Sequence, residues 1–115
     1  MSFVEMIKVG ELNDRTMKMV IIDNHEYMLA RIGDNYYCSD NRCPHMGGNL
    51  SNGQLEGTVV TCPRHHSQFD LKDGHNIRWT DWKGIKLATA KLLKSPRPLK
   101  MYDVKIEDGK LMANI

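Results

Sequence analysis

Two short segments of this 115-residue chain each carry a cysteine and a histidine beside a proline. The first segment supplies Cys43 and His45 as a Cys-x-His pair, and the second supplies Cys62 and His65 as a Cys-x2-His pair. Two thiolates and two imidazoles form a complete set of ligands for a metal centre. A strand expected at residues 58–61 can bring the two segments face to face. We therefore predict that these four side chains bind one metal centre.

The elements that must position these segments are predicted to be short strands. Runs rich in β-formers alternate with Gly, Asn and Asp turns, which is typical of a β-sandwich or barrel-like domain. Residues 107–109 form a hairpin turn near the C-terminus. Residues 82–93 repeat apolar side chains at helical spacing, which predicts one short helix. The predicted strands are 3–9, 17–22, 27–32, 36–38, 58–61, 68–71, 102–106 and 110–113.

The ligand pattern resembles that of the Rieske [2Fe–2S] proteins, in which two cysteines hold one iron and two histidines hold the other. Residues 68–74 look like the strand and turn after that family's second cluster loop, and residues 95–99 look like its proline loop. The resemblance implies a single all-β Rieske domain over residues 1–115. It would have an antiparallel β-sandwich or barrel-like base, formed by residues 1–37 and 75–115, with a cluster-binding subdomain of about 38–74 inserted in it.

The resemblance also assigns the cofactor. It implies one [2Fe–2S] cluster per chain, bound by Cys43, His45, Cys62 and His65. The outer nitrogens of the two imidazoles are expected to be exposed, so that they form the exit for the electron.

Several positions near the ligands resemble those of the low-potential members of the family. Respiratory Rieske proteins join their cluster loops by a disulfide, and the matching positions here are Gly48 and Arg64. Ser67 matches a serine that donates a hydrogen bond to sulfur, whereas Phe69 replaces a tyrosine with the same role. Because a lost donor leaves the reduced cluster less stable, we expect a low reduction potential. His66 departs from the family, which often has glycine there.

The function implied by this resemblance is one-electron transfer. The chain would take electrons from a reductase and pass them to an acceptor such as a ring-hydroxylating oxygenase, with transient docking at the His45/His65 end. A chain of 115 residues leaves no room for the catalytic domain of an oxygenase, so it is not expected to be an enzyme by itself. One alternative is a small Rieske-like subunit of an assimilatory nitrite reductase. Another is a zinc-stapled binding module, because Cys2His2 also suits zinc.

Composition and charge restrict the expected location of the protein and the classes of partner that it could bind. No apolar run approaches the roughly 20 residues that cross a bilayer, and the N-terminus lacks the features of a signal peptide, so a cytoplasmic protein without a membrane partner is expected. Three cysteines, an odd number, argue against a disulfide framework. Residues 72–100 carry a net charge of +6, whereas the rest of the chain carries −4, which favours an acidic partner. Nucleic acid is not expected, since Trp79 and Trp82 alone make a poor stacking platform.

The remaining residues of interest have simpler interpretations. Cys38 is expected to be a buried small side chain, and Trp79 and Trp82 are expected to pack in the core. His25 and His75 are expected on the surface. The connection formed by residues 77–94 is longer than is usual before the proline loop of this family.

Overall fold

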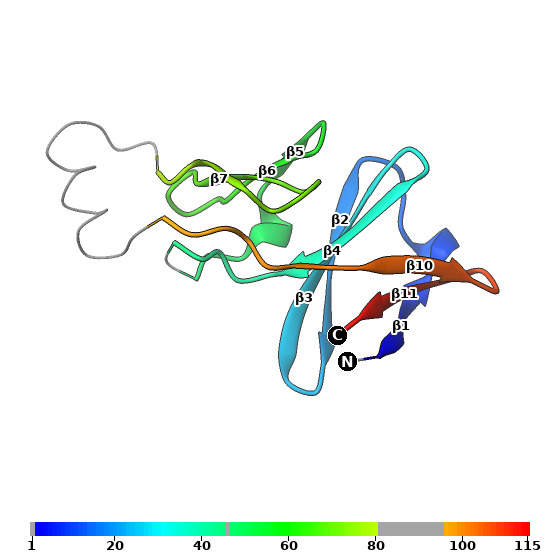
Figure 1. Cartoon of the computed structure of the whole chain (residues 1–115). Helices are drawn as coiled ribbons and strands as arrows, with labels where there is room; N and C mark the ends of the chain where they lie inside the picture. Colours follow the sequence, from blue (N-terminus) through cyan, green and yellow to red (C-terminus); the bar gives the residue numbers. More distant parts are fainter. Residues whose placement is uncertain (1, 46, 81–95) are drawn as a thin grey trace, which may run out of the picture.

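The computed structural model describes residues 2–45, 47–80 and 96–115, and these form three antiparallel sheets (Figure 1). The first sheet has the order β1-β11-β10, the second β2-β3-β4-β9 and the third β5-β6-β7-β8. The all-β prediction is therefore confirmed. The predicted helix at 82–93 lies outside the described residues, among which no helix is long and apolar enough to cross a membrane.

The first sheet joins the N-terminal strand to the last two strands of the chain. The second sheet contains the three long strands that follow the N-terminal strand, together with the short β9. The first sheet contains β1 (Phe3–Lys8), β10 (Val104–Glu107) and β11 (Lys110–Asn114). The second contains β2 (Thr16–Ile22), β3 (His25–Ile32), β4 (Asn35–Asp40) and β9 (Met101–Tyr102). A 3-10 turn, η1 (Val9–Glu11), follows β1.

The third sheet is made of three-residue strands. Two of them lie in the sequence between the two cluster loops, residues 43–48 and 62–67, and the other two follow the second loop. The strands are β5 (Gln54–Glu56), β6 (Val59–Thr61), β7 (Gln68–Asp70) and β8 (Asn76–Arg78), preceded by the 3-10 turn η2 (Leu50–Asn52). The sequence predicted β6 and β7 but not β5 and β8. Both missed strands are short and mostly polar, so their own residues give little sign of a strand, and pairing with β6 and β7 holds them.

Hairpin turns set the register of the long strands. Asp23 and Asn24 between β2 and β3 both have positive φ, and so do Asp108 and Gly109 between β10 and β11. Two consecutive positive φ values are the signature of the type I′ turn, whose twist matches that of the flanking strands. The predicted C-terminal hairpin is thus confirmed.

The core is divided into two clusters by the second sheet. On β3, Tyr27 and Leu29 belong to the cluster shared with the first sheet, whereas Met28 and Ala30 belong to the cluster shared with the third. This alternation follows from the two-residue period of a strand, and it makes β3 buried on both faces. The core cluster shared with the third sheet also contains Cys43 and Cys62, so the two predicted thiol ligands are part of the core and not appended to it.

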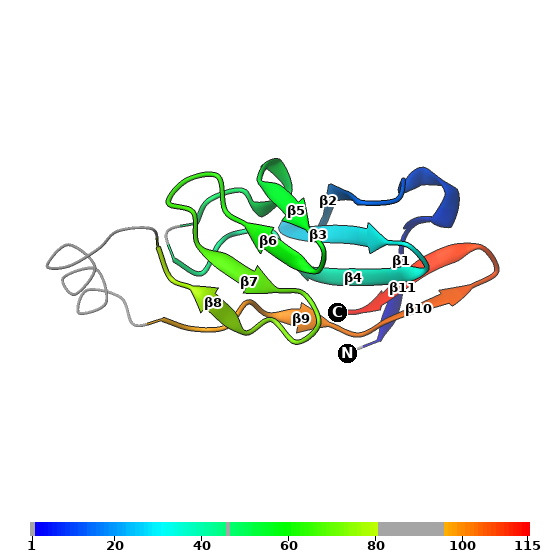
Figure 2. The same cartoon turned by 90° about the horizontal axis from the view of Figure 1, so that it is seen from above.

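The proline segment, residues 96–100, ties the third sheet to the second. The Leu99 N–H donates to the Gly74 carbonyl at 2.8 Å, and the Asp40 N–H donates to the Lys100 carbonyl at 3.0 Å. In both Figure 1 and Figure 2 this orange segment runs beside the third sheet before it enters β9. It therefore fixes the end of β4, from which the first cluster loop departs.

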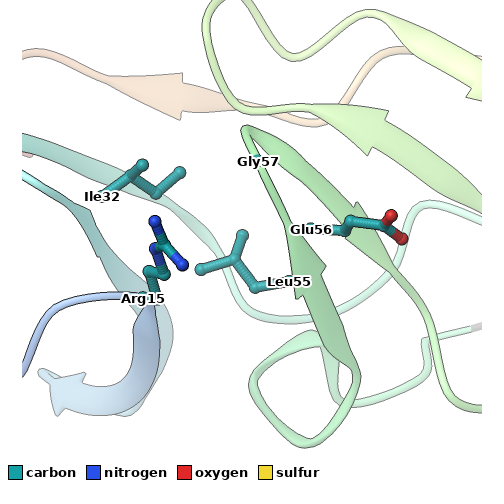
Figure 3. A pocket seen from close by; sticks show the side chains of 5 residues that line it. All are labelled: Arg15, Ile32, Leu55, Glu56 and Gly57. Atoms are coloured by element: carbon teal, nitrogen blue, oxygen red, sulfur yellow. The ribbon is translucent and has the colours of Figure 1, made fainter.

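A shallow pocket of about 320 Å³ marks another place where the second and third sheets meet. Figure 3 shows Arg15 and Ile32 facing Leu55 of β5 across it, while the Glu56 carboxylate points away. It contains none of the predicted ligands, so it is a junction between sheets and not the site.

Candidate metal centre

The two cluster loops have the same backbone architecture. In the first, the Cys43 N–H donates to the Gly48 carbonyl and the Gly47 N–H donates to the Cys43 carbonyl, both at 2.8 Å. In the second, the Cys62 N–H donates to the Ser67 carbonyl at 2.8 Å and the His66 N–H donates to the Cys62 carbonyl at 3.1 Å. Each loop is therefore closed by the same pair of bonds around its cysteine, although the histidine is the second residue after the cysteine in the first loop and the third in the second.

The residue four positions after each cysteine has a left-handed backbone. Gly47 has φ +73° and His66 has φ +61°. Glycine adopts this conformation without strain, and histidine tolerates it better than most other residues do. His66 thus stands at a position whose backbone conformation favours glycine, and histidine can adopt that conformation. The side chain of His66 is exposed, in contrast to the buried Cys62.

The two thiols are buried together. Cys43 and Cys62 are 3% and 2% exposed. A hydrogen bond from the Cys43 thiol lowers the pKa of Cys62, and the backbone amides of Arg64 and His65 lower it further, whereas burial opposes them. The same thiol contact and burial raise the pKa of Cys43. Backbone amides aimed at sulfur are groups that stabilise a thiolate ligand.

The two imidazoles form a second pair. The ring centroids of His45 and His65 are 5.3 Å apart, and the rings meet edge to face at 82°. The expectation that both imidazoles are exposed is wrong for His45, which is only 3% exposed, while His65 is half-buried. The cause is Trp79, whose ring packs edge-on against His45 at 4.8 Å between centroids. The half-buried His65 is the more accessible of the two imidazoles.

The arrangement fits a two-iron cluster better than a single ion. The thiols are paired with each other and the imidazoles with each other, so each pair can serve one iron. A structural zinc ion needs four ligands around one point. Among the residues that the structure describes, no three His, Cys, Asp or Glu side chains are placed to hold one ion. The donor set thus suits a [2Fe–2S] cluster, with Cys43 and Cys62 on one iron and His45 and His65 on the other.

The positions matched to the respiratory disulfide are neighbours. A Cβ atom added at Gly48 would lie 3.1 Å from the Cβ of Arg64 and 2.5 Å from the Sγ of Cys62. Gly48 and Arg64 therefore face each other across the two loops, without thiols to join them. The described cysteines are all free, and burial raises the pKa of Cys38 to about 12, in agreement with its expected role as a buried small side chain.

A polar network at the base of the first loop was not predicted from the sequence. The buried Asn41 side chain donates to Glu26 at 3.0 Å and to Asn49 at 2.8 Å, and its oxygen accepts from the Ser51 N–H. Arg42 binds the other Glu26 oxygen at 2.7 Å. We call Glu26, Asn41 and Arg42 the loop clasp. Its only sequence signal is the polar run that ends β4 immediately before Cys43.

The second loop is held by the last residue of β8 and by the residues that follow it. Arg78 donates to the His66 carbonyl from Nε at 3.1 Å and from Nη2 at 2.9 Å. Thr80 Oγ1 donates to the His65 carbonyl at 3.1 Å. We call residues 78–80 the loop brace. As expected, Trp79 within it is buried, and His25 and His75 are exposed; Trp82 lies outside the described residues.

Comparison with known proteins identifies the family of this chain. The model of the Rieske [2Fe-2S] domain matches residues 2–93. The ferredoxin component of the naphthalene 1,2-dioxygenase system of Pseudomonas putida is 26% identical over 98% of this chain and 95% of its own. The ferredoxin component of the 2,4-dinitrotoluene dioxygenase system of Burkholderia sp. (strain RASC) is 30% identical over 81% of each chain.

Solved structures agree on the fold. The ferredoxin of carbazole 1,9a-dioxygenase from Nocardioides aromaticivorans IC177 superposes with a TM-score of 0.78 at 22% identity, covering 98% of this chain and 97% of its own. A putative small subunit of NADPH nitrite reductase superposes with a TM-score of 0.73 at 18% identity over the whole of both chains. The family match and these relatives lead to one conclusion: this chain belongs to the Rieske [2Fe–2S] domain family, whose cofactor is a single [2Fe–2S] cluster.

Proposed function

We propose that this protein is a one-electron carrier of the low-potential Rieske ferredoxin type, with its cluster bound by Cys43, His45, Cys62 and His65. The observation that carries the proposal is the sorting of these ligands into a thiol pair and an imidazole pair on two loops of equal construction. When bound, the cluster accepts and releases a single electron. The chain's own part is to hold the ligands, to aim backbone amides at the sulfur atoms, and to keep the thiols away from water.

Electrons pass from a reductase to an acceptor, and the relatives support a ring-hydroxylating oxygenase as that acceptor. The curated relatives are named as ferredoxin components of dioxygenase systems, and the two described above match 98% and 81% of this chain. The likeness to a nitrite reductase subunit is a likeness of fold alone at 18% identity. We also propose that the carrier works in the cytoplasm, without membrane or nucleic-acid partners.

Partners dock at the His45/His65 end. His65 is the accessible imidazole there, and the apolar residues assigned to the proposed surface include the half-buried Pro44 and the exposed Pro63 and Pro96. A carrier must release its partner quickly, so the contact should be small, below about 1,200 Å² in total. Met46 and Lys94, which belong to the proposed surface by sequence, lie outside the described residues.

Ligand replacement tests the proposal. Anaerobically purified protein should be red-brown and contain about two irons per chain. His45→Ala and His65→Ala should abolish cluster assembly, because each removes half of one iron's protein ligands. His66→Ala is the matched control, since this neighbouring histidine is exposed and should leave the iron content unchanged. Stoichiometric zinc without iron, or equal damage from His66→Ala, would contradict the assignment.

Reduction of a partner tests the acceptor. The reduced protein should reduce the oxygenase component with which it purifies, or which its neighbouring genes encode, in a stopped-flow measurement. If it instead purifies with a nitrite reductase large chain and reduces only that, the alternative function holds and the ligand assignment is unaffected.

A further inference from the structure

The indole N–H of Trp79 is a buried donor whose acceptor is missing from the described part of the chain. Trp79 is 3% exposed, and its Nε1 atom is buried without a partner among the described residues. Leaving such a donor unpaired costs the free energy of its desolvation, because no hydrogen bond replaces the one that it made to water. Buried polar groups of native proteins therefore nearly always bind protein, water or a bound ligand. An acceptor supplied by a ligand is thus expected close to this indole.

The indole is held in place by the loop brace. The hydroxyl of Ser67 lies in hydrogen-bond contact with the Trp79 carbonyl. On either side, Arg78 donates to the His66 carbonyl and Thr80 donates to the His65 carbonyl. Because the residues before and after Trp79 are also bound to the second cluster loop, the backbone that carries the indole is fixed to that loop.

The fixed indole faces the metal centre. Its ring meets the ring of His45 edge-on, at 4.8 Å between centroids and 68° between planes. It also packs in the same core cluster as Cys43 and Cys62. Trp79 thus contacts a proposed ligand of one iron and shares a core with the proposed ligands of the other, so the indole that carries the unpaired N–H lies beside the place that the cluster would fill.

We propose that the indole N–H of Trp79 donates a hydrogen bond to a sulfur atom of the bound cluster. This inference rests on the proposed function, because it needs the cluster in place. Phe69 has no O–H to donate, so Trp79 supplies a side-chain donor from a different element of the fold. A hydrogen bond to sulfur stabilises the reduced cluster, which carries the extra negative charge. Trp79 should therefore raise the reduction potential.

The first test compares Trp79→Phe with Trp82→Phe by protein-film voltammetry. Both variants replace indole by phenyl, but only the first removes the proposed donor while keeping an aromatic ring against His45. Trp79→Phe should lower the equilibrium constant for reduction about tenfold, which is 59 mV for a one-electron couple. Trp82→Phe should leave the potential of the wild type unchanged. An unchanged potential in Trp79→Phe would overturn the inference, as would an equal fall in both variants.

The second test detects the indole nitrogen directly, and it does not depend on whether Trp79→Phe folds. Wild-type protein labelled with ¹⁵N at the tryptophan indoles is reduced, and its cluster is examined by pulsed electron paramagnetic resonance. A weak indole ¹⁵N coupling should be present in the wild type and in Trp82→Phe. A loaded cluster without that coupling would overturn the inference and leave the proposed function standing. Wild-type protein without any iron cluster would instead overturn the proposed function.

Discussion

His66 and Gly47 occupy the same place in their two loops, and this equivalence shows what the second loop tolerates. Both residues have positive φ, and each donates its N–H to the carbonyl of the cysteine four residues earlier. A non-glycine residue in this region carries some backbone strain. The bonds from Arg78 to the His66 carbonyl hold the strained residue in place. The two loops thus share one backbone geometry although a different residue type stands at this position.

Gly48, which occupies one of the two positions matched to the respiratory disulfide, should not tolerate a side chain. Gly48→Ala would place a Cβ atom 2.5 Å from the Sγ of Cys62, closer than such contacts occur, so one loop must move. We expect this variant to retain much less iron per chain than the wild type, measured by iron content after anaerobic purification. Gly10→Ala is the control, because its added Cβ would have no neighbour within 4 Å and should leave the iron content unchanged. Full iron retention by Gly48→Ala would mean that the loops lie further apart than in this structure.

Phe69 offers a direct way to tune the potential. Its side chain is fully buried in the same core cluster as Cys43 and Cys62, where a tyrosine hydroxyl would find few acceptors other than sulfur. Phe69→Tyr should therefore raise the reduction potential, by about 59 mV for each tenfold gain in the equilibrium constant for reduction. Voltammetry on protein of equal iron content measures the change. A potential that stays the same or falls would show that residue 69 does not direct its ring edge at the cluster.

At the scale of elements, the sequence predicted the strands and turns that have a local residue pattern, and it missed the short strands that form only through pairing with neighbouring strands. The long strands and the C-terminal hairpin follow from local pattern and turn residues, and the structure confirms them. The strands β5 and β8 have little pattern of their own and exist through pairing. The burial of His45 was likewise beyond local reasoning, because Trp79 reaches it from a distant part of the chain. The division into a base and an inserted cluster-binding subdomain stays a prediction, as do the four ligands.

The loop clasp joins the first cluster loop to β3, and its strength should depend on pH. Hydrogen bonds from Arg42 and then Asn41 lower the pKa of Glu26 below its ordinary value of 4.5. A lowered pKa means that the folded state stabilises the carboxylate, so this stabilisation is present above about pH 4.5. It is lost as the pH falls through the lower pKa of the folded state.

Replacing the carboxylate tests that dependence. Glu26→Gln should lower the thermal unfolding midpoint at pH 7, and the difference from the wild type should shrink as the pH falls from 5 towards 3. Midpoints measured by circular dichroism across this range check the sign. Glu56→Gln, at an exposed carboxylate of β5 outside the clasp, should give a difference that does not follow this course. A Glu26→Gln difference that is constant with pH would show that the clasp does not act through the charge of Glu26.

At the scale of the whole molecule, charge and structure divide the chain in a similar way. Of the net charge of +6 in residues 72–100, the described residues carry +3, since Lys72, Arg78, Arg97 and Lys100 give +4 and Asp73 gives −1. Arg78 binds the second cluster loop, and the proline segment binds the end of β4, from which the first cluster loop departs. The compensating net charge of −4 is spread over the rest of the chain. An approaching acidic partner would therefore be drawn towards the metal centre and not towards the first sheet, which suits a carrier whose partner must find one end quickly.

This steering should be visible in the salt dependence of electron transfer. The Debye length shrinks to about 8 Å at physiological ionic strength, so the association rate with the natural acceptor should fall as salt is added. Lys100 is exposed beside Tyr102, and Lys100→Glu and Lys94→Glu, each made as a single variant, should lower that rate at low salt and flatten its salt dependence. Lys18→Glu, at an exposed position of β2 outside the basic stretch, is the control of equal charge change for each single variant. Stopped-flow rates from low to high salt, on proteins with unchanged cluster spectra, measure the effect. A rate that is flat with salt and indifferent to both reversals would reduce the basic stretch to an ordinary solvated surface, and docking at His65 would then rest on apolar contact alone.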